Sequence, residues 1–236
     1  MGFEGSTASI NHHSFEPMSM VNRKFLTLKT SFLLALASGA RRSELHAVTR
    51  SGVKHSNSWR EVWLQPSAQF IAKNQKAQRP GTLFSPITVP ALGPTLGPNL
   101  EQDRTLCPVR ALKFYLDRTK PILRDRKKLF IAFKKGYTRE IAPITLSSWL
   151  KATVRLAYEL IKPDELKTLR VTGHQVRAIA ASWAVLGGVS VDQIMTSCHW
   201  QSHNTFTSFY LKDLAWEDGE NFSLGPIVAA QQVLNL

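Results

Sequence analysis

Two arginines in this sequence each stand three positions from another ionisable side chain, close enough for the two groups to act together at one site. Arg41 precedes Glu44, and Arg177 follows His174, so each pair lies on one face if its segment is helical. For Arg41 and Glu44 the spacing alone predicts a surface ion pair that contributes little to stability. The second pair precedes the apolar run 178–184, where a charged group needs a partner, and both a functional and a purely structural role stay open for it.

A tyrosine further along the chain completes the set of candidate residues. Tyr210 lies between Phe209 and Leu211, and taken alone it indicates core packing. Its place in the order of the chain changes that interpretation. An arginine at a glycine corner is followed by a lysine in an expected hairpin, by His-x-x-Arg, by His-Trp and then by this tyrosine about ten residues later. That order is the one found in tyrosine recombinases.

The resemblance to tyrosine recombinases of the phage integrase type rests on three segments. Residues 35–45 are similar to the first arginine box of the family, residues 173–177 to its His-x-x-Arg box and residues 205–213 to its nucleophile box. Residues 104–112 and 224–232 are similar to segments of the recombinases of DIRS and Ngaro-type retroelements. The resemblance therefore covers most of the chain and points to this subgroup.

The resemblance implies a catalytic set and a role for each member. Carried over position by position, the set is Arg41, Lys73, His174, Arg177, Trp200 and the nucleophile Tyr210, with Glu44 in a supporting role. Two assignments stay open. The hairpin lysine is Lys73 or Lys76, which the spacing does not distinguish, and we favour Lys73. His199 stands eleven residues before the tyrosine and is the alternative to Trp200, which stands ten before it.

The implied reaction is DNA strand breakage and rejoining through a covalent 3′-phosphotyrosine intermediate, as in site-specific recombination and the integration of mobile elements such as retrotransposons. A phosphodiester under attack gathers negative charge on two oxygens, and two arginines can stabilise that charge with their fixed forks of donors. The implied partners are double-stranded DNA and further copies of the chain, which form a synaptic tetramer on DNA. The alternatives are a type IB topoisomerase and a catalytically inactive, domesticated DNA-binding or interaction module.

Other chemistries are not indicated by the sequence. It contains neither a dinucleotide-binding glycine fingerprint nor a P-loop. His199 and His203 have the spacing of a zinc pair on a helix, but Trp200 stands where a metalloprotease carries its glutamate, and no third ligand is evident. Acidic residues do not cluster as a two-metal nuclease requires. The covalent intermediate would conserve the bond energy, so the sequence predicts neither a cofactor nor a metal.

The charge of the chain favours a polyanionic partner. Lysine and arginine number 30 against 17 acidic residues, which gives a net charge of +13 in 236 residues. The basic residues are spread along the chain and not concentrated in one amphipathic helix, which favours nucleic acid over a membrane surface. With only two cysteines and no apolar run near the roughly 20 residues of a membrane span, we expect an intracellular protein that acts in the nucleus.

The elements that must position these residues are mostly helical. Helices are expected at 26–37, ending at Gly39, at 41–48, from Pro108 to Leu116, from Thr145 or Ser147 to Tyr158, and at 173–186, 190–198 and 205–214. Strand-like runs at 62–64, 70–71 and 87–89 predict a small antiparallel sheet, and residues 129–133 are a further strand candidate.

The predicted fold class is mostly α with a small antiparallel β-sheet (α+β). By resemblance it is the catalytic-domain fold of the DNA breaking-and-rejoining enzymes. Residues 1–14 are predicted to be a flexible leader, and residues 15–236 the tyrosine recombinase catalytic domain. The amino-terminal core-binding domain that usually precedes the catalytic domain in this family is predicted to be absent.

Overall fold

The structure, a computed structural model, describes residues 15–72, 84–92, 104–134, 136, 140–161, 172–198 and 200. In these ranges the chain forms helices and one three-stranded antiparallel sheet, which confirms the predicted mixture for this part of the protein. The predicted leader, residues 1–14, and the helix expected at 205–214 lie outside the described residues. Among the described helices, none combines the length and the apolar character needed to cross a membrane.

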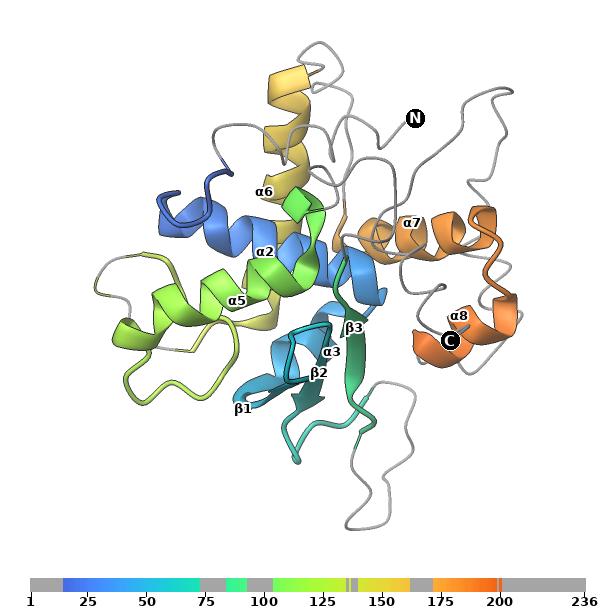
Figure 1. Cartoon of the computed structure of the whole chain (residues 1–236), viewed down its shortest axis with the longest axis horizontal. Helices are drawn as coiled ribbons and strands as arrows, with labels where there is room; N and C mark the ends of the chain where they lie inside the picture. The colour runs from blue at the N-terminus through green and yellow to red at the C-terminus, as the bar shows by residue number, and fades with distance from the viewer. Residues whose placement is uncertain are drawn as a thin grey trace.

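Helix α2 (Arg23–Ser38) runs through the middle of the molecule (Figure 1). It packs against α5 (Pro108–Thr119), α6 (Pro143–Ile161) and α7 (Gly173–Leu186), which explains why most of its residues are buried. The buried apolar side chains of the described residues form one core around it. The helix that the apolar pattern predicts in this position is confirmed.

The sheet follows α2 closely in the chain. Helix α3 (Arg42–Ala47) leads into β1 (Val48–His55), which pairs antiparallel with β2 (Glu61–Pro66), and β2 pairs antiparallel with β3 (Ile87–Pro90). The second and third strands are those predicted from their apolar runs. Strand β1 escapes prediction, because buried and exposed residues do not alternate along it.

Two predicted strands are wrong. Residues 70–71 follow β2 without joining the sheet, and residues 129–133 form no strand. Only a single bridge connects this second segment to β1, at Lys128. Beyond the bridge, the backbone N–H of Ile131 donates to the hydroxyl oxygen of Tyr115 at 2.9 Å. The Tyr115 side chain therefore accepts a backbone hydrogen bond that a neighbouring strand would otherwise accept.

Helices α5 and α6 both begin with a proline in the first turn. A proline suits this position because the helix leaves the N–H there unbonded in any case. For Pro108 and α5 this is the predicted arrangement. Helix α6 begins at Pro143, so Thr145 and Ser147 lie inside the helix and the prediction that one of them caps it is wrong. A short 3-10 helix, η1 (Lys120–Ile122), follows α5.

The last two described helices agree with their predicted ranges. Helix α7 covers the predicted residues, and α8 (Val191–Ser197) is flanked by the predicted ends. Ser190 caps α8, because its Oγ accepts a hydrogen bond from the backbone N–H of Gln193 at 3.3 Å. The Gln193 side chain accepts in return from the backbone N–H of Ser190, also at 3.3 Å. This reciprocal cap fixes where α8 begins.

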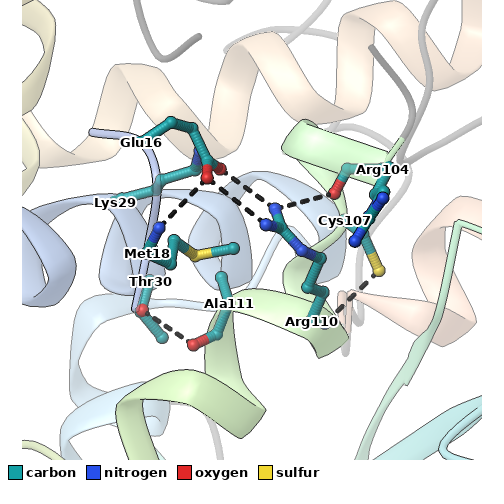
Figure 2. Close-up of polar contacts among 8 residues, drawn as sticks. All are labelled: Glu16, Met18, Lys29, Thr30, Arg104, Cys107, Arg110 and Ala111. Carbon is teal, nitrogen blue, oxygen red and sulfur yellow. Dashed lines mark hydrogen bonds and ion pairs between the residues drawn. The ribbon is translucent and has the colours of Figure 1, made fainter. Parts of the chain in front are cut away.

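The segment before α2 is fixed by one carboxylate, shown in Figure 2. Glu16 Oε1 lies 2.7 Å from Lys29 Nζ and 3.0 Å from Arg110 Nη1. The Lys29 side chain is fully buried, and burial lowers its pKa more than the attraction of Glu16 raises it. Arg118 holds the same segment by donating to the carbonyl oxygen of Met18 at 2.9 Å. Loss of the Glu16 charge would therefore leave a costly cation in the interior.

Replacing Glu16 with glutamine is expected to lower the free energy of unfolding by about 2 kcal/mol at neutral pH. Burial by itself raises the pKa of the Glu16 carboxyl, but hydrogen bonds and attraction from Arg110 and Lys29 outweigh burial and hold the pKa below its usual value of 4.5. The stabilisation by ionised Glu16 is thus complete above pH 4.5 and is lost as the pH falls through the lower folded-state pKa.

Urea unfolding of wild type and Glu16→Gln over a range of pH measures this effect. The difference in unfolding free energy between the two proteins must shrink as the pH falls below 4.5. A difference that stays constant down to acid pH would contradict the assignment of this stabilisation to the Glu16 charge.

Candidate functional site

The glycine corner predicted after α2 positions the first arginine. Gly39 follows α2 with a φ of 55°, in the left-handed region that glycine favours. Arg41 then stands immediately before α3, and its backbone N–H donates to Oε2 of Glu44 at 2.7 Å. The Arg41 side chain returns to the same carboxylate, with Nη1 2.8 Å from Oε1. Backbone and side chain of one arginine are thus held by one acid.

This ion pair is not the surface pair that its spacing predicts. The Glu44 side chain is 0% exposed and the Arg41 side chain is 16% exposed. A carboxylate removed from water requires hydrogen bonds and a cation. The prediction is wrong because spacing along one helix determines which side chains meet, whereas other elements determine whether they are covered.

The second arginine reaches the same carboxylate from α7. Arg177 is 2% exposed, and its Nη1 lies 3.7 Å from Glu44 Oε2. Nη1 also donates to the carbonyl oxygen of Gly39 at 2.6 Å, and Nη2 donates to that of Cys198 at 2.7 Å. One guanidinium therefore connects the glycine corner to the end of α8. The two terminal nitrogens of this charged group therefore have the acceptors that burial in an apolar helix requires.

Trp200 covers a face of Arg177. The guanidinium carbon is 4.2 Å from the centroid of the indole ring, within the distance of a cation–π contact. Trp200 is itself buried, and its backbone N–H donates to the carbonyl oxygen of Met195 in α8 at 2.8 Å. Of the two side chains considered for this role, Trp200 lies beside the arginine, whereas His199 is outside the described residues.

A thiol absent from the predicted set packs beneath the glycine corner. Cys198 Sγ lies 3.7 Å from the carbonyl oxygen of Ser38, and a Cβ on Gly39 would stand only 2.5 Å from that sulfur. Burial raises the pKa of the Cys198 thiol to about 11, although the charge of Arg177 opposes the shift. The group is therefore a neutral, packed thiol near pH 7. Its place two residues before Trp200 is the one feature of the sequence that points to it.

The structure brings together four of the predicted site residues: Arg41, Glu44, Arg177 and Trp200. For His174 it places the backbone, in the first turn of α7 and three positions before Arg177. The other candidates lie outside the described residues, and their roles stay predictions: Lys73, Lys76, His199 and Tyr210.

The assembled group is suited to an anion. Two guanidiniums share one carboxylate, which leaves one net positive charge beside an indole. Within the described ranges, the remaining side-chain N–H groups of Arg41 are bonded to no acceptor, and Arg41 is the more exposed of the two arginines. Arg41 is therefore the group that can bind a phosphate oxygen from solvent. No three His, Cys, Asp or Glu side chains of the described residues are grouped to hold a metal ion.

Comparison with known proteins adds no family, since no family model and no curated protein matches this chain. The class of site is therefore defined by its own geometry. An arginine pair with a buried carboxylate and an indole lies where α2, α3, α7 and α8 meet. This combination defines a candidate phosphate-binding site.

Proposed function

We propose that this chain is the catalytic domain of a tyrosine recombinase from a mobile element similar to the DIRS and Ngaro-type retroelements. The observation that carries the proposal is the shared carboxylate of Glu44, which lies 2.8 Å from Arg41 and 3.7 Å from Arg177. Trp200 stacks on the second arginine. These residues come from separate segments of the sequence, and each has a place in the set that the resemblance implies. The mixture of helices with a small antiparallel sheet supports the same proposal.

In the proposed reaction the oxygen of Tyr210 attacks a DNA phosphorus atom, and the bond from phosphorus to the 5′ oxygen breaks. Arg41 and Arg177 stabilise the negative charge on the two non-bridging oxygens. His174 accepts the proton of the tyrosine hydroxyl, and the hairpin lysine protonates the leaving 5′ oxygen. Attack by the 5′ hydroxyl of another strand reverses these steps and releases the tyrosine, so no cofactor is consumed.

Glu44 acts in this scheme through the arginines and not on the substrate. Its carboxylate lies beside Arg177 and fixes the Arg41 backbone and side chain, so the more exposed guanidinium is oriented before DNA binds. Orientation in advance matters because reorganising charged groups during the reaction would raise the barrier. Glu44 is therefore a positioning residue.

The proposed partners follow from the charge and from the reaction. A net charge of +13 suits binding to double-stranded DNA through its phosphates. Exchange of strands between two duplexes requires one active site for each strand, hence four copies of the chain in a synaptic tetramer. The proposal includes action on DNA inside the cell, in the nucleus.

One observation favours a second candidate function, a domesticated DNA-binding module that no longer cuts. Both terminal nitrogens of Arg177 donate to backbone carbonyls, and the residue is 2% exposed. An arginine held in this way supports the fold, and it reaches a phosphate only if DNA binding opens the site. The two candidates differ in whether a covalent complex forms.

A nicked duplex tests the chemistry. Cleavage beside the nick releases a short fragment that diffuses away, so a covalent complex accumulates and a denaturing gel resolves it. Randomised sequence around the nick removes the need to know the target. We expect an adduct with wild type in the presence of EDTA, and Tyr210→Phe should reduce it by about 1,000-fold or more while DNA retention changes little.

Tyr137→Phe is the matched control and should retain the adduct. Tyr115 is no alternative nucleophile, because burial raises its pKa to about 12 and its oxygen accepts the N–H of Ile131. An adduct that survives in Tyr210→Phe would overturn the assignment. Cleavage that is lost in EDTA and restored by magnesium would indicate another class of nuclease, and DNA retention without any adduct would favour the binding module.

A further inference from the structure

A surface pocket of about 300 Å³ lies between α5 and the turn that joins β1 to β2. Its walls include the apolar side chains Trp59, Val109 and Phe114, and charged side chains border it: Arg110, Lys113 and Asp117. None of these residues belongs to the candidate phosphate site. An apolar wall bordered by more cations than acids selects a ligand with both apolar and acidic groups.

Charged or polar side chains already contact the two aromatic rings of the pocket. Lys113 Nζ lies 5.6 Å from the ring centroid of Trp59, and the guanidinium of Arg110 lies 5.4 Å from that of Phe114. His55 stacks on Trp59 with the centroids 3.9 Å apart. A nucleobase would have to displace His55 or Lys113 to stack there. The pocket is better suited to a side chain that enters edge-on, with carboxylates facing the cations.

Lys113 is the cation of this pocket that lacks an acidic partner. Within the part of the chain that is described, no carboxylate oxygen lies within 4.0 Å of its ammonium. Arg110, by contrast, is paired with Glu16, as Figure 2 shows. An exposed cation beside an apolar wall gains most from a carboxylate attached to an apolar side chain.

The most acidic segment of the chain has this chemistry. Residues 213–220 read Asp-Leu-Ala-Trp-Glu-Asp-Gly-Glu, so four of eight positions are acidic in a chain that has 17 acidic residues and a net charge of +13. Leucine and tryptophan in the same segment supply apolar groups. We propose that this acidic segment occupies the pocket of its own chain, with a carboxylate beside Lys113 and an apolar side chain against the wall.

The length of the chain permits this placement. The residues between Trp200 and the acidic segment can span roughly 40 Å, which is about the diameter of a domain of this size. A tethered segment also acts at an effective concentration near the millimolar range, so a weak site is filled by its own chain before a second copy competes. Because Tyr210 lies just before the segment, docking would also limit the reach of the tyrosine. That consequence rests on the proposed function, whereas the docking itself does not.

Zero-length carbodiimide cross-linking of the full chain, without DNA, tests the proposal. The reagent joins an ammonium to a carboxylate only when the two are in contact. We expect an amide between Lys113 and Glu217 or Asp218 in the monomer band, identified by mass spectrometry of the digest. Lys120, exposed at the end of the same helix, is the internal control and should be linked to the segment at least about ten-fold less.

Charge reversal provides a second measurement. Replacing Glu217, Asp218 and Glu220 with lysine should remove the cross-link and speed amide hydrogen exchange around Phe114, because the pocket loses its cover. Equal linkage to Lys113 and Lys120, a link found only in the dimer band, or unchanged exchange in the charge-reversed variant would each overturn the proposal. Tyr210→Phe should leave every readout unchanged, so failure here is separate from failure of the proposed chemistry.

Discussion

Replacement of Gly39 by alanine is expected to lower the free energy of unfolding by about 3 kcal/mol. A φ of 55° costs a residue with a side chain about 1 kcal/mol. The new Cβ would also stand 2.5 Å from Cys198 Sγ, so the glycine corner or the end of α8 must move. Such a movement displaces the carbonyl oxygens of Gly39 and Cys198 that hold Arg177. Urea unfolding measures the loss of stability.

Two comparisons separate the packing effect from the backbone effect. Gly136 has a φ of 80°, and among the described residues no atom lies within 4 Å of a Cβ built there, so Gly136→Ala should cost only about 1 kcal/mol. Adding Cys198→Ala to Gly39→Ala removes the sulfur and should recover about 1 kcal/mol or more. The contact with Cys198 would not explain the loss of stability if the effects of Gly39→Ala and Cys198→Ala simply add in the double variant. The same conclusion would follow if Gly39→Ala costs no more than Gly136→Ala.

Replacement of Glu44 by glutamine is expected to lower the free energy of unfolding by about 3 kcal/mol, although the shape of the side chain is kept. The carboxylate is 0% exposed and lies 2.8 Å from Arg41 Nη1 and 3.7 Å from Arg177 Nη1. Its neutralisation leaves two guanidiniums close together with no anion between them. Added sulfate or phosphate should restore part of the loss, because an anion that binds the folded state replaces the missing charge.

Glu140→Gln is the matched control for this prediction. Glu140 is exposed, and its carboxylate accepts from the backbone N–H groups of Lys127 at 2.8 Å and Lys128 at 3.3 Å. Its replacement should change the unfolding free energy by less than about 1 kcal/mol and should show no dependence on sulfate. Equal effects of the two substitutions would mean that the charge of Glu44 does not organise the arginines.

The elements that depend on neighbours in the chain could be predicted from the amino-acid pattern alone. The apolar pattern of α2 and the glycine after it predicted that helix and its end, and Ser190 predicted the start of α8. These features succeed because a cap or a helical face is decided by residues within one or two turns. Strand β1 failed because its pattern has no period of two, and a strand depends on partners elsewhere in the chain.

The contacts among the candidate residues depend on how the helices pack, and the amino-acid pattern does not predict that packing. Spacing placed Glu44 next to Arg41 but described the pair as a surface contact, whereas Arg177 and the packing of α7 and α8 remove it from water. Cys198 contacts Ser38 at the glycine corner, and the two residues are 160 positions apart in the sequence, so no local pattern could indicate this contact. Removing a charge from water changes its free energy far more than an adjacent residue in the sequence does. Whether a charge is removed from water depends on which helices pack over it.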